Sequence, residues 1–550
     1  MRPLGFAFAV IVLFLSVNRP AYRAFFAEDD LDNLANARDV GVIDIAKTLT
    51  QPSVTGGNEF RATTYAFYAA MVRTFGLRYA PYVAAIHLIH LLNVLLIFFV
   101  ARASGAEPLG ACAAALFYAF HAAAFDIYWK PMYAFDLLCA TFALASLWAY
   151  ARGRWIWALL LFWLSLRAKE VTIFFPLVLA TYEIFLGEKR WKRLLPFFAI
   201  STLAGILAML SSRSFDNDYS FRFTWTALSQ TIPFYARHLA EFPWIGLVVL
   251  AIPFLTSDRR VRFGIATFLL LLAPMLFLPG RLFAAYLYAP MVGLAIALSA
   301  VQRPIWLGIF FMLWIPWNYS VFRTERTQAL TLAYERRNWF EPVADFFTKH
   351  PDTDTVLWDG TPLSVPEHFI SGAARLLRNR KPVRVTWLNR AKDEAQQPNL
   401  VVLVWDEARR KLNVLGRQPD APYFDLNETA PVWQLTSGWS ANQGHLRWSK
   451  PHATARLSRP ANAKAFEIAV NVFGFDATHP GQLAVTLDGV SLGTRVLDIS
   501  EPHAFQFPLP PEGSAGQSVE IGINFSPPFH DPNGEGDLGQ PVTALGFVTK

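Results

Sequence analysis

Long apolar runs dominate the first 322 residues of this 550-residue chain. A helix needs about 20 apolar residues to cross a bilayer, and most of these runs approach or reach that length. Short turns rich in Arg and Lys separate the runs, whereas residues 323–550 have the mixed composition of a soluble protein. Only 17% of all residues are charged, below the roughly 25% that is usual for soluble domains. The sequence therefore predicts a polytopic helical membrane domain over 1–322, followed by a soluble portion.

Eleven transmembrane helices are expected, of which the fifth and sixth are short. The amino terminus has the positive start of a signal peptide, but no small-residue cleavage site follows, so we expect an uncleaved first helix. The expected spans are 4–19, 80–101, 108–126, 132–150, 154–167, 170–187, 193–211, 237–256, 262–279, 282–300 and 304–321.

The positive charges predict the orientation of these helices. The basic turns fall on one side of the membrane, which the positive-inside rule assigns to the cytoplasm. An odd number of spans then places the soluble portion on the other side, together with loop 20–79. We expect a bacterial inner membrane, with the amino terminus in the cytoplasm and the carboxy-terminal portion in the periplasm. The residues that define the basic side are Arg2, Arg102, Arg152, Arg154, 188–193, 258–262 and Arg303.

Two other features of the composition bear on partners. The formal net charge is +7, but the basic residues of the first half lie in short turns, which indicates an orientation signal and no nucleic-acid partner. Cys112 and Cys139 both lie within hydrophobic runs, so we expect neither a disulfide nor structural zinc.

The soluble portion divides into two predicted modules. Residues 323–424 alternate between helical and strand patterns, with helices at 339–350 and 366–379 and strands between and after them, which predicts an α/β module. Residues 425–550 contain short strands every 8–12 residues, typical of an antiparallel β-sandwich of jelly-roll-like type. Three tryptophans near its start suggest either a sugar-stacking face or core and rim residues, with the second interpretation favoured; they are Trp433, Trp439 and Trp448.

The acidic cluster Glu28-Asp29-Asp30 follows the first apolar run by about ten residues. Carboxylates at the mouth of a membrane helix are costly unless they have a use. In a partly dehydrated pocket, Asp29 or Asp30 can act as general base toward an attacking hydroxyl. The alternative is a helix start, because acids favour helix amino termini. The sequence favours neither interpretation.

Two further groups of ionisable residues fall on the same outer side. His121 and Asp126 close the third expected span, with Trp129-Lys130 directly after them. Asp126 offers a second carboxylate, for a metal or to orient an acceptor, while a lone His in an apolar helix is more often a packed core residue.

Arg167, Lys169 and Glu170 interrupt an otherwise apolar stretch, and Arg281 occupies a later outer turn. Positive charges on the outer side run against the orientation rule, and Arg and Lys are suited to holding a phosphate. The alternative is an ordinary interfacial turn.

The order of these motifs resembles the C-type (GT-C) glycosyltransferases, the superfamily of the protein O-mannosyltransferases and related enzymes that use lipid-linked sugars. The resemblance covers roughly residues 1–300 and leaves the soluble portion out. It is carried by Glu28-Asp29-Asp30, the stretches 61–64, 76–77 and 87–93, Phe120-His121 with Asp126 and Trp129, Ala168-Lys169-Glu170 with Pro176, and Tyr286-Leu287-Tyr288-Ala289-Pro290 with Gly293. Where Asp126 stands the family more often has Glu, and Pro more often follows the His.

The resemblance implies a polyprenyl-phosphate sugar donor bound in the membrane and an acceptor that approaches from outside. Asp29 or Asp30 would deprotonate the acceptor hydroxyl, and attack at the anomeric carbon would invert its configuration. Lys169, Arg167 and Arg281 would stabilise the departing phosphate, and Glu170 would orient Lys169. A divalent metal, Mg²⁺ or Mn²⁺, held by Asp30 and Asp126 is a further implication, although some members of the superfamily need none.

Three other functions would use some of the same features. A transporter or flippase of lipid-linked sugars would show inverted repeats and charges at mid-membrane, whereas this chain has no internal repeat and its ionisable residues gather on one side. A polysaccharide polymerase or ligase shares the donor but joins long chains. A structural anchor for an outer sugar-binding module needs far fewer than eleven spans.

Overall fold

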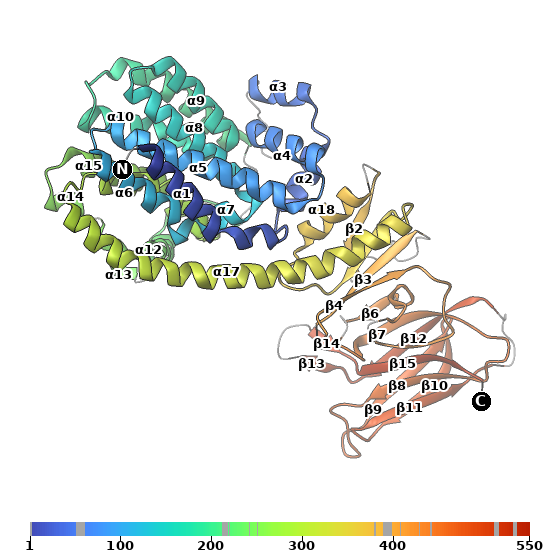
Figure 1. Ribbon diagram of the computed structural model, residues 1–550. Helices are drawn as coiled ribbons and strands as arrows, with labels where there is room; N and C mark the ends of the chain where they lie inside the picture. Colours follow the sequence, from blue (N-terminus) through green and yellow to red (C-terminus); the bar gives the residue numbers. More distant parts are fainter. Residues whose placement is uncertain are drawn as a thin grey trace. The chain divides into compact units, whose positions relative to one another are not determined.

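The computed structural model shows two compact units, Met1–Ala333 and Tyr334–Lys550 (Figure 1). The predicted boundary at residue 322 and the observed one at 333 both fall within a single long helix, α17 (Pro304–Lys349). The structure describes residues 3–50, 61–211, 218, 220–240, 243–249, 251–378, 381–388, 399–407, 409–427, 429–440, 443–510, 516–531 and 536–549.

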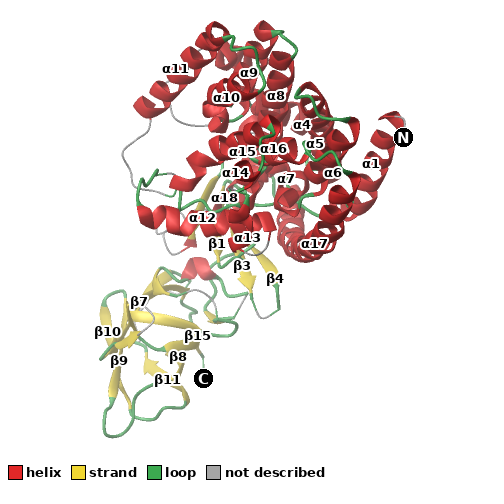
Figure 2. Cartoon of the chain, turned by 90° about the vertical axis from the view of Figure 1, so that its left-hand side faces the viewer, coloured by secondary structure: helices red, strands yellow, loops and turns green. Residues whose placement is uncertain are grey.

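The first unit is helical throughout (Figure 2). Its helices are α1 (Pro3–Val17), α2 (Asp30–Arg38), α3 (Val42–Thr50), α4 (Ala62–Phe75), α5 (Tyr79–Ala103), α6 (Pro108–Phe120), α7 (Phe125–Trp129), α8 (Ala134–Ala151), α9 (Trp155–Ala168), α10 (Phe175–Phe185), α11 (Leu195–Ser211), α12 (Trp225–Ala240), α13 (Pro243–Val248), α14 (Ile252–Leu255), α15 (Arg259–Leu272), α16 (Met291–Leu298) and the first part of α17, with short 3-10 turns such as η4 (Pro131–Tyr133), η5 (Glu170–Phe174) and η8 (Ala284–Leu287) between them.

Fewer helices qualify as membrane spans than the eleven that we expected. Within the described residues, four helical stretches are long and apolar enough to cross a membrane: Tyr79–Ala103, Pro131–Ala151, Arg259–Phe277 and the helix that begins at Pro304. A fifth is added if α6 and the bent continuation Ala122–Trp129 count as one span. The other expected spans correspond to shorter helices, and the one expected at 237–256 falls across α12, α13 and α14, with residues 241, 242 and 250 outside the described set.

Two local features position the helices of this unit. Gly264 of α15 and Gly293 of α16 face each other so closely that an added Cβ on Gly264 would lie 2.5 Å from the Gly293 carbonyl oxygen, so only glycine permits this contact. The break between α6 and α7 is held by Asn318 of α17. Its Oδ1 accepts the Ala122 N–H at 2.7 Å and its Nδ2 donates to the Phe120 carbonyl at 2.6 Å. The chain bends by 50° at this break.

The second unit begins with the predicted α/β module. Strands β2 (Arg384–Trp387), β1 (Thr355–Asp359) and β3 (Leu400–Asp406) pair in parallel, and β4 (Lys411–Gly416) adds an antiparallel edge. Helix α18 (Glu367–Leu377) occupies the predicted 366–379 segment. The helix that we expected at 339–350 is not separate: it forms the end of α17, because residues 317–338 directly before it contain neither Pro nor Gly.

Nine of the remaining strands form an antiparallel sheet with the order β10-β9-β12-β7-β15-β8-β11, in which β5 also pairs with β15 and β6 with β7; β13 and β14 form a separate two-stranded sheet. The strands that follow β4 are β5 (Tyr423–Asp425), β6 (Ser437–Trp439), β7 (Arg447–Ser458), β8 (Ala465–Asn471), β9 (Gly481–Leu487), β10 (Val490–Leu497), β11 (Pro502–Pro508), β12 (Ser518–Ser526), β13 (Phe529–Asp531), β14 (Gly536–Leu538) and β15 (Pro541–Val548).

Alternate residues of these strands are buried in one core that also includes residues of β1 and β3, as expected for strands with one solvated face. Trp433 and Trp439 belong to this core, which confirms the core interpretation for these two side chains. Trp448 packs against Phe473 and Phe529. A jelly-roll-like arrangement stays a prediction.

Candidate functional site

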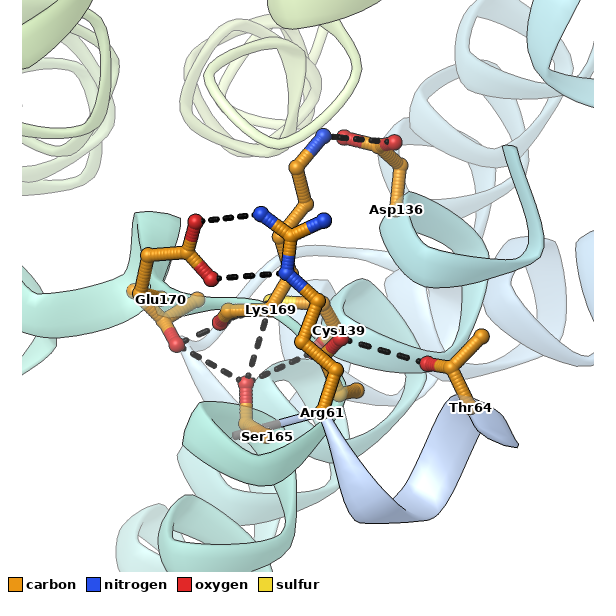
Figure 3. Close-up of polar contacts among 9 residues, drawn as sticks. Arg61, Thr64, Asp136, Cys139, Ser165, Lys169 and Glu170 are labelled. Carbon is orange, nitrogen blue, oxygen red and sulfur yellow. Dashed lines mark hydrogen bonds and ion pairs between the residues drawn. The ribbon is translucent and has the colours of Figure 1, made fainter. Parts of the chain in front are cut away.

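Two ion pairs lie together at one end of the helical unit (Figure 3). The Lys169 ammonium donates to both carboxylate oxygens of Asp136, at 2.7 and 2.8 Å. The Arg61 guanidinium forms a bidentate pair with Glu170, at 3.0 and 2.5 Å. Because Lys169 and Glu170 are adjacent in the chain, the four side chains form one cluster with two cations and two carboxylates.

The elements that bring this cluster together come from distant parts of the sequence. Asp136 lies in the first turn of α8, Arg61 immediately precedes α4, and the Lys169-Glu170 turn joins α9 to η5. The turn is fixed by the Thr64 hydroxyl, which donates to the Ala168 carbonyl, and by Ser165, which bonds to Thr172. These contacts hold the two cations at the end of the helices, where the apolar runs stop.

A small cavity of about 20 Å³ adjoins the Lys169–Asp136 pair. Asp136, Cys139, Tyr286 and Tyr288 are among its lining residues. The Tyr286 ring lies 5.1 Å from the Lys169 ammonium, within cation–π range. The segment around Tyr286 matches the last motif of the resemblance, so the structure joins that motif to the Lys-Glu motif.

Buried polar side chains support the inner wall of this cavity. The Tyr288 hydroxyl is bonded to His90 Nδ1 at 2.9 Å and accepts from Asn93 Nδ2 at 3.0 Å. His90 also contacts the Ala119 carbonyl through Nε2 at 3.1 Å. His90 and Asn93 are both fully buried, which is costly unless they are hydrogen-bonded as seen here.

A second cluster contains three residues that the sequence nominated. The Lys130 ammonium pairs with Glu28 at 2.9 Å and with Asp126 at 3.1 Å. Glu28 has a positive φ of 41°, which is uncommon for a residue with a side chain and often marks a functional site. Glu325 of α17 lies close enough to be influenced by the charges of Asp126 and Lys130.

Asp29 and Asp30 lie next to this second cluster, at the start of α2. Asp29 is the N-cap residue of the helix, and Asp30 lies in its first turn. Asp30 is 1% exposed and its Oδ2 accepts the Ala27 N–H at 2.6 Å, whereas Asp29 is partly exposed. The helix-start interpretation is therefore confirmed, and it is compatible with a chemical role for the exposed carboxylate.

A short turn connects the two ion-pair clusters. The 3-10 turn η4 joins Lys130 to the start of α8, where Asp136 lies, and the Tyr68 hydroxyl donates to the Pro131 carbonyl within this turn. The sequence prediction that the acidic cluster and the Lys-Glu turn share one end of the membrane domain agrees with this arrangement.

Electrostatics keeps both lysines of the site charged. Burial, the largest effect, lowers the pKa of Lys169, but the charge of Asp136, the Tyr286 hydroxyl and the hydrogen bond to Asp136 together raise it above its ordinary value. Burial likewise opposes the charge of Lys130, and Asp126 and Glu28 raise its pKa. The pKa of Arg61 is raised in the same way by Glu170. All three groups are cations at neutral pH.

The structure assigns different contacts to three of the predicted site residues. Arg167 is buried beside Trp163, with its guanidinium carbon 4.5 Å from that ring. The Arg281 guanidinium stacks over Phe283 at 4.6 Å. His121 packs against Phe117, Trp314 and Trp317 and accepts the Ala123 N–H, so the packed-core interpretation of His121 is the one that its contacts favour.

Sequence reasoning missed Arg61 and Asp136 as members of the site, and it paired Glu170 wrongly. Glu170 was expected to orient Lys169, yet it binds Arg61, and Asp136 binds Lys169. A signal for Asp136 existed, because it is a lone acid at the start of an expected span. Arg61 precedes Lys169 by more than a hundred residues, and only the tertiary fold shows that they meet.

At the predicted metal site, Asp30 and Asp126 both have other partners. Asp126 is paired with Lys130, and Asp30 accepts a backbone N–H. Among the residues that the structure describes, no three His, Cys, Asp or Glu side chains converge as metal ligands. These contacts do not fit a bound divalent ion, and the metal stays a prediction.

Comparison with known proteins finds similarity to solved structures. No model of a known protein family matches the sequence, and no curated protein matches it significantly. The chain is similar to ArnT from Cupriavidus metallidurans bound to undecaprenyl phosphate, with a TM-score of 0.43 and 14% identity over 73% of this chain and 93% of ArnT.

It is also similar to the arabinofuranosyltransferase AftD from mycobacteria, with a TM-score of 0.37 and 13% identity over 99% of this chain and 61% of AftD. The chain thus spans less than two thirds of the length of AftD.

Proposed function

We propose that this chain is a membrane glycosyltransferase that moves a sugar from a polyprenyl-phosphate donor to an acceptor hydroxyl. The observation that carries the proposal is the cluster of Lys169, Asp136, Arg61 and Glu170 at one end of an apolar helical unit. Placing ionisable groups at a membrane costs free energy, so such groups are usually found where they bind a ligand or take part in a reaction. A donor with an anionic phosphate and an apolar tail would place its phosphate against the two cations and its tail among the apolar helices.

The two cations would bind the donor phosphate. Arg61 offers a planar fork suited to bidentate contact with phosphate oxygens, and Lys169 offers a compact point charge. In the structure, both are balanced by carboxylates of Glu170 and Asp136. These carboxylates hold the cations in position. Arg167 and Arg281 were expected to share this role, and their stacking on aromatic rings supports a positioning role for both.

The reaction would be a single displacement at the anomeric carbon. The acceptor oxygen forms a bond to that carbon on the face opposite the phosphate, and the bond from the carbon to the phosphate oxygen breaks. The electron pair leaves with polyprenyl phosphate, whose growing charge the cations stabilise. The proton of the acceptor hydroxyl passes to a carboxylate. The configuration at the anomeric carbon is inverted.

Asp29 is the better suited of the two candidate bases. Its carboxylate is partly exposed, while Asp30 is buried and accepts the Ala27 N–H. Glu28, Asp126 and Lys130 form the adjacent ion-paired group that would orient the acceptor. No step is assigned to a metal.

The membrane setting completes the proposal. We infer an inner membrane of a bacterium, with the site and the carboxy-terminal unit on the periplasmic side, as the positive charges of the turns indicate. The apolar helices support a membrane location.

The experiment that tests the role of the cations measures two quantities on the purified protein in lipid nanodiscs. Sugar transfer is followed with a panel of polyprenyl-phosphate monosaccharides and an envelope extract as acceptor, and binding is followed with polyprenyl phosphate alone. Lys169→Met should weaken both. The matched control is Lys189→Met, because Lys189 is an exposed lysine in the turn between α10 and α11. Wild-type levels of transfer and binding in Lys169→Met would contradict the proposal. Movement of the donor across the bilayer without transfer would instead identify a flippase.

A further inference from the structure

A second cavity lies within the helical unit, with a volume of about 610 Å³. It is formed between α1, α5, α6 and α17, and residues from each helix line it, including Phe6, Phe98, Leu116 and Phe311. Every lining side chain is apolar or small, and none is charged. The volume is in the range of typical ligand cavities, and the lining chemistry selects an aliphatic occupant.

This cavity is remote from the candidate active site. Helix α5 begins at Tyr79, whose hydroxyl donates to the Trp129 carbonyl beside Lys130, and the cavity adjoins Phe98 near its other end. Helix α6 runs in the opposite sense: it begins at Pro108 in the cavity and ends at the break that leads to Asp126. The cavity therefore lies at the end of the helices opposite to the ion-pair clusters.

Two exposed arginines flank the cavity at this end. Arg102 follows Phe98 by one helical turn of α5, and its guanidinium donates to the Ala106 carbonyl in the turn before Pro108. Arg303 immediately precedes Pro304, the first lining residue of α17. Among the described residues, neither arginine forms an ion pair with a carboxylate, although Glu107 lies in the same turn as Arg102.

A third arginine near this turn is already neutralised. Arg260 donates to the Gly105 carbonyl at 3.1 Å and forms an ion pair with Asp258 at 2.6 Å. Among the described residues that flank the cavity, Arg102 and Arg303 are therefore the arginines without a carboxylate partner. An apolar cavity with two such cations at its rim is complementary to an anionic lipid, which has an aliphatic chain and a negatively charged head group.

We propose that this cavity binds one acyl chain of an anionic phospholipid, with the phosphate of the head group held by Arg102 and Arg303. The site is separate from the proposed donor site and does not depend on the proposed reaction. The lipid would fill the space between α1 and α17, which both line the cavity, and so stabilise the end of the helical unit farther from the ion pairs.

The chain offers a matched pair of substitutions to test occupancy of the cavity. An added Cβ at Gly308, which lines the cavity, meets no atom within 4 Å, and the same holds for Gly5, which is not among the lining residues. Gly308→Trp should therefore fill the cavity without strain on the backbone, and Gly5→Trp is the control. Native mass spectrometry of the full chain, with phosphatidylglycerol or phosphatidylcholine of identical acyl chains added, measures the retained lipid.

The wild type and Gly5→Trp should retain one phosphatidylglycerol, and Gly308→Trp should lose it. Arg303→Gln and Arg102→Gln should each weaken retention of phosphatidylglycerol by about fivefold, with little effect on phosphatidylcholine. Equal retention of the two lipids by the wild type, or undiminished retention by Gly308→Trp, would overturn the proposal.

Cys112 provides a test that needs no bulky substitution. It is a free thiol that lines the cavity, whereas the other cysteine, Cys139, is buried beside the ion pairs. In detergent, phosphatidylglycerol should slow the modification of Cys112 by N-ethylmaleimide, and phosphatidylcholine should slow it far less. A labelling rate of Cys112 that phosphatidylglycerol leaves unchanged would contradict the proposed site, whatever the folding of Gly308→Trp.

Discussion

At the scale of single residues, Lys169 and Asp136 neutralise each other's buried charge. Both side chains are largely buried, with 13% and 9% of their surface exposed. A charge in such a place is tolerated because its partner supplies two hydrogen bonds, and removal of one partner leaves the other charge uncompensated. The stability of the fold and the binding of an anion are therefore linked at this pair.

Lys169→Met should lower the free energy of unfolding by about 3 kcal/mol, because it leaves the Asp136 carboxylate buried without its cation. The double variant Lys169→Met, Asp136→Asn should recover most of this loss, since no buried charge then remains, but it should not recover sugar transfer. Thermal unfolding and transfer assays on the three proteins check the prediction. Recovery of both quantities in the double variant would show that Lys169 acts only on stability.

In the second unit, the stability that the turn at Asp476 contributes should depend on pH. Hydrogen bonds from the Thr478 hydroxyl and from the backbone N–H groups of His479 and Thr478 lower the pKa of Asp476 from 3.8 to about 2. Because the pKa is lowered on folding, the turn contributes stability above pH 3.8, and this contribution is lost as the pH falls toward 2.

The difference in Tm between wild type and Asp476→Ala should therefore shrink over this acid range. Asp498→Ala, which changes another exposed carboxylate of the same unit, serves as the control. A difference that stays constant with pH would contradict the role assigned to the turn.

The sequence predicted single residues better than pairs of residues. Glu28, Asp126 and Lys130 were all nominated, and they meet. Asp136 was not predicted as a site residue, because it lies at the start of an apolar run. The partner of Arg61 could not be predicted either, because hydropathy and the order of charges do not show which helices are neighbours. His121 is the opposite case. Its position at the outer end of an expected span made it a candidate site residue, but its ring is packed among aromatic side chains.

At the scale of elements, the break between α6 and α7 positions the second cluster. Asp126 and Lys130 lie just beyond the break, and Asn318 of α17 satisfies the two backbone groups that the break exposes. An expected span at 108–126 therefore became two helices that meet at 50°. The sequence did not predict the bend, because the residue that stabilises it lies almost two hundred residues away.

Asn318→Leu should destabilise the helical unit by about 2–4 kcal/mol, since the Ala122 N–H and the Phe120 carbonyl would be buried without partners. Sugar transfer should fall as well, because Asp126 and Lys130 would lose their fixed position. Tyr319→Phe is the control, as Tyr319 is exposed. Thermal unfolding together with transfer checks this prediction. Unchanged stability in Asn318→Leu would show that the bend does not depend on Asn318.

At the scale of the whole molecule, the chain consists of a helical unit and a β-rich unit that share the helix α17. The basic turns predict that the second unit lies on the side of the membrane opposite to the turn that contains Lys189.

In a protein with Cys112 and Cys139 replaced by Ser, a membrane-impermeant maleimide should label Ser491→Cys from outside the cell. It should label Lys189→Cys only after the membrane is opened. Labelling of both positions from the same side would contradict the predicted orientation.

The most direct test of the central claim is transfer of a sugar from a polyprenyl-phosphate donor by the protein in lipid nanodiscs. Wild type would be measured beside Asp29→Asn, Asp30→Asn and Asp44→Asn, the last being an exposed carboxylate of α3. The account predicts that wild type and Asp44→Asn transfer sugar, and that Asp29→Asn stays folded and binds donor but loses turnover. Absence of donor consumption by the wild type, or equal turnover in all four proteins, would contradict it.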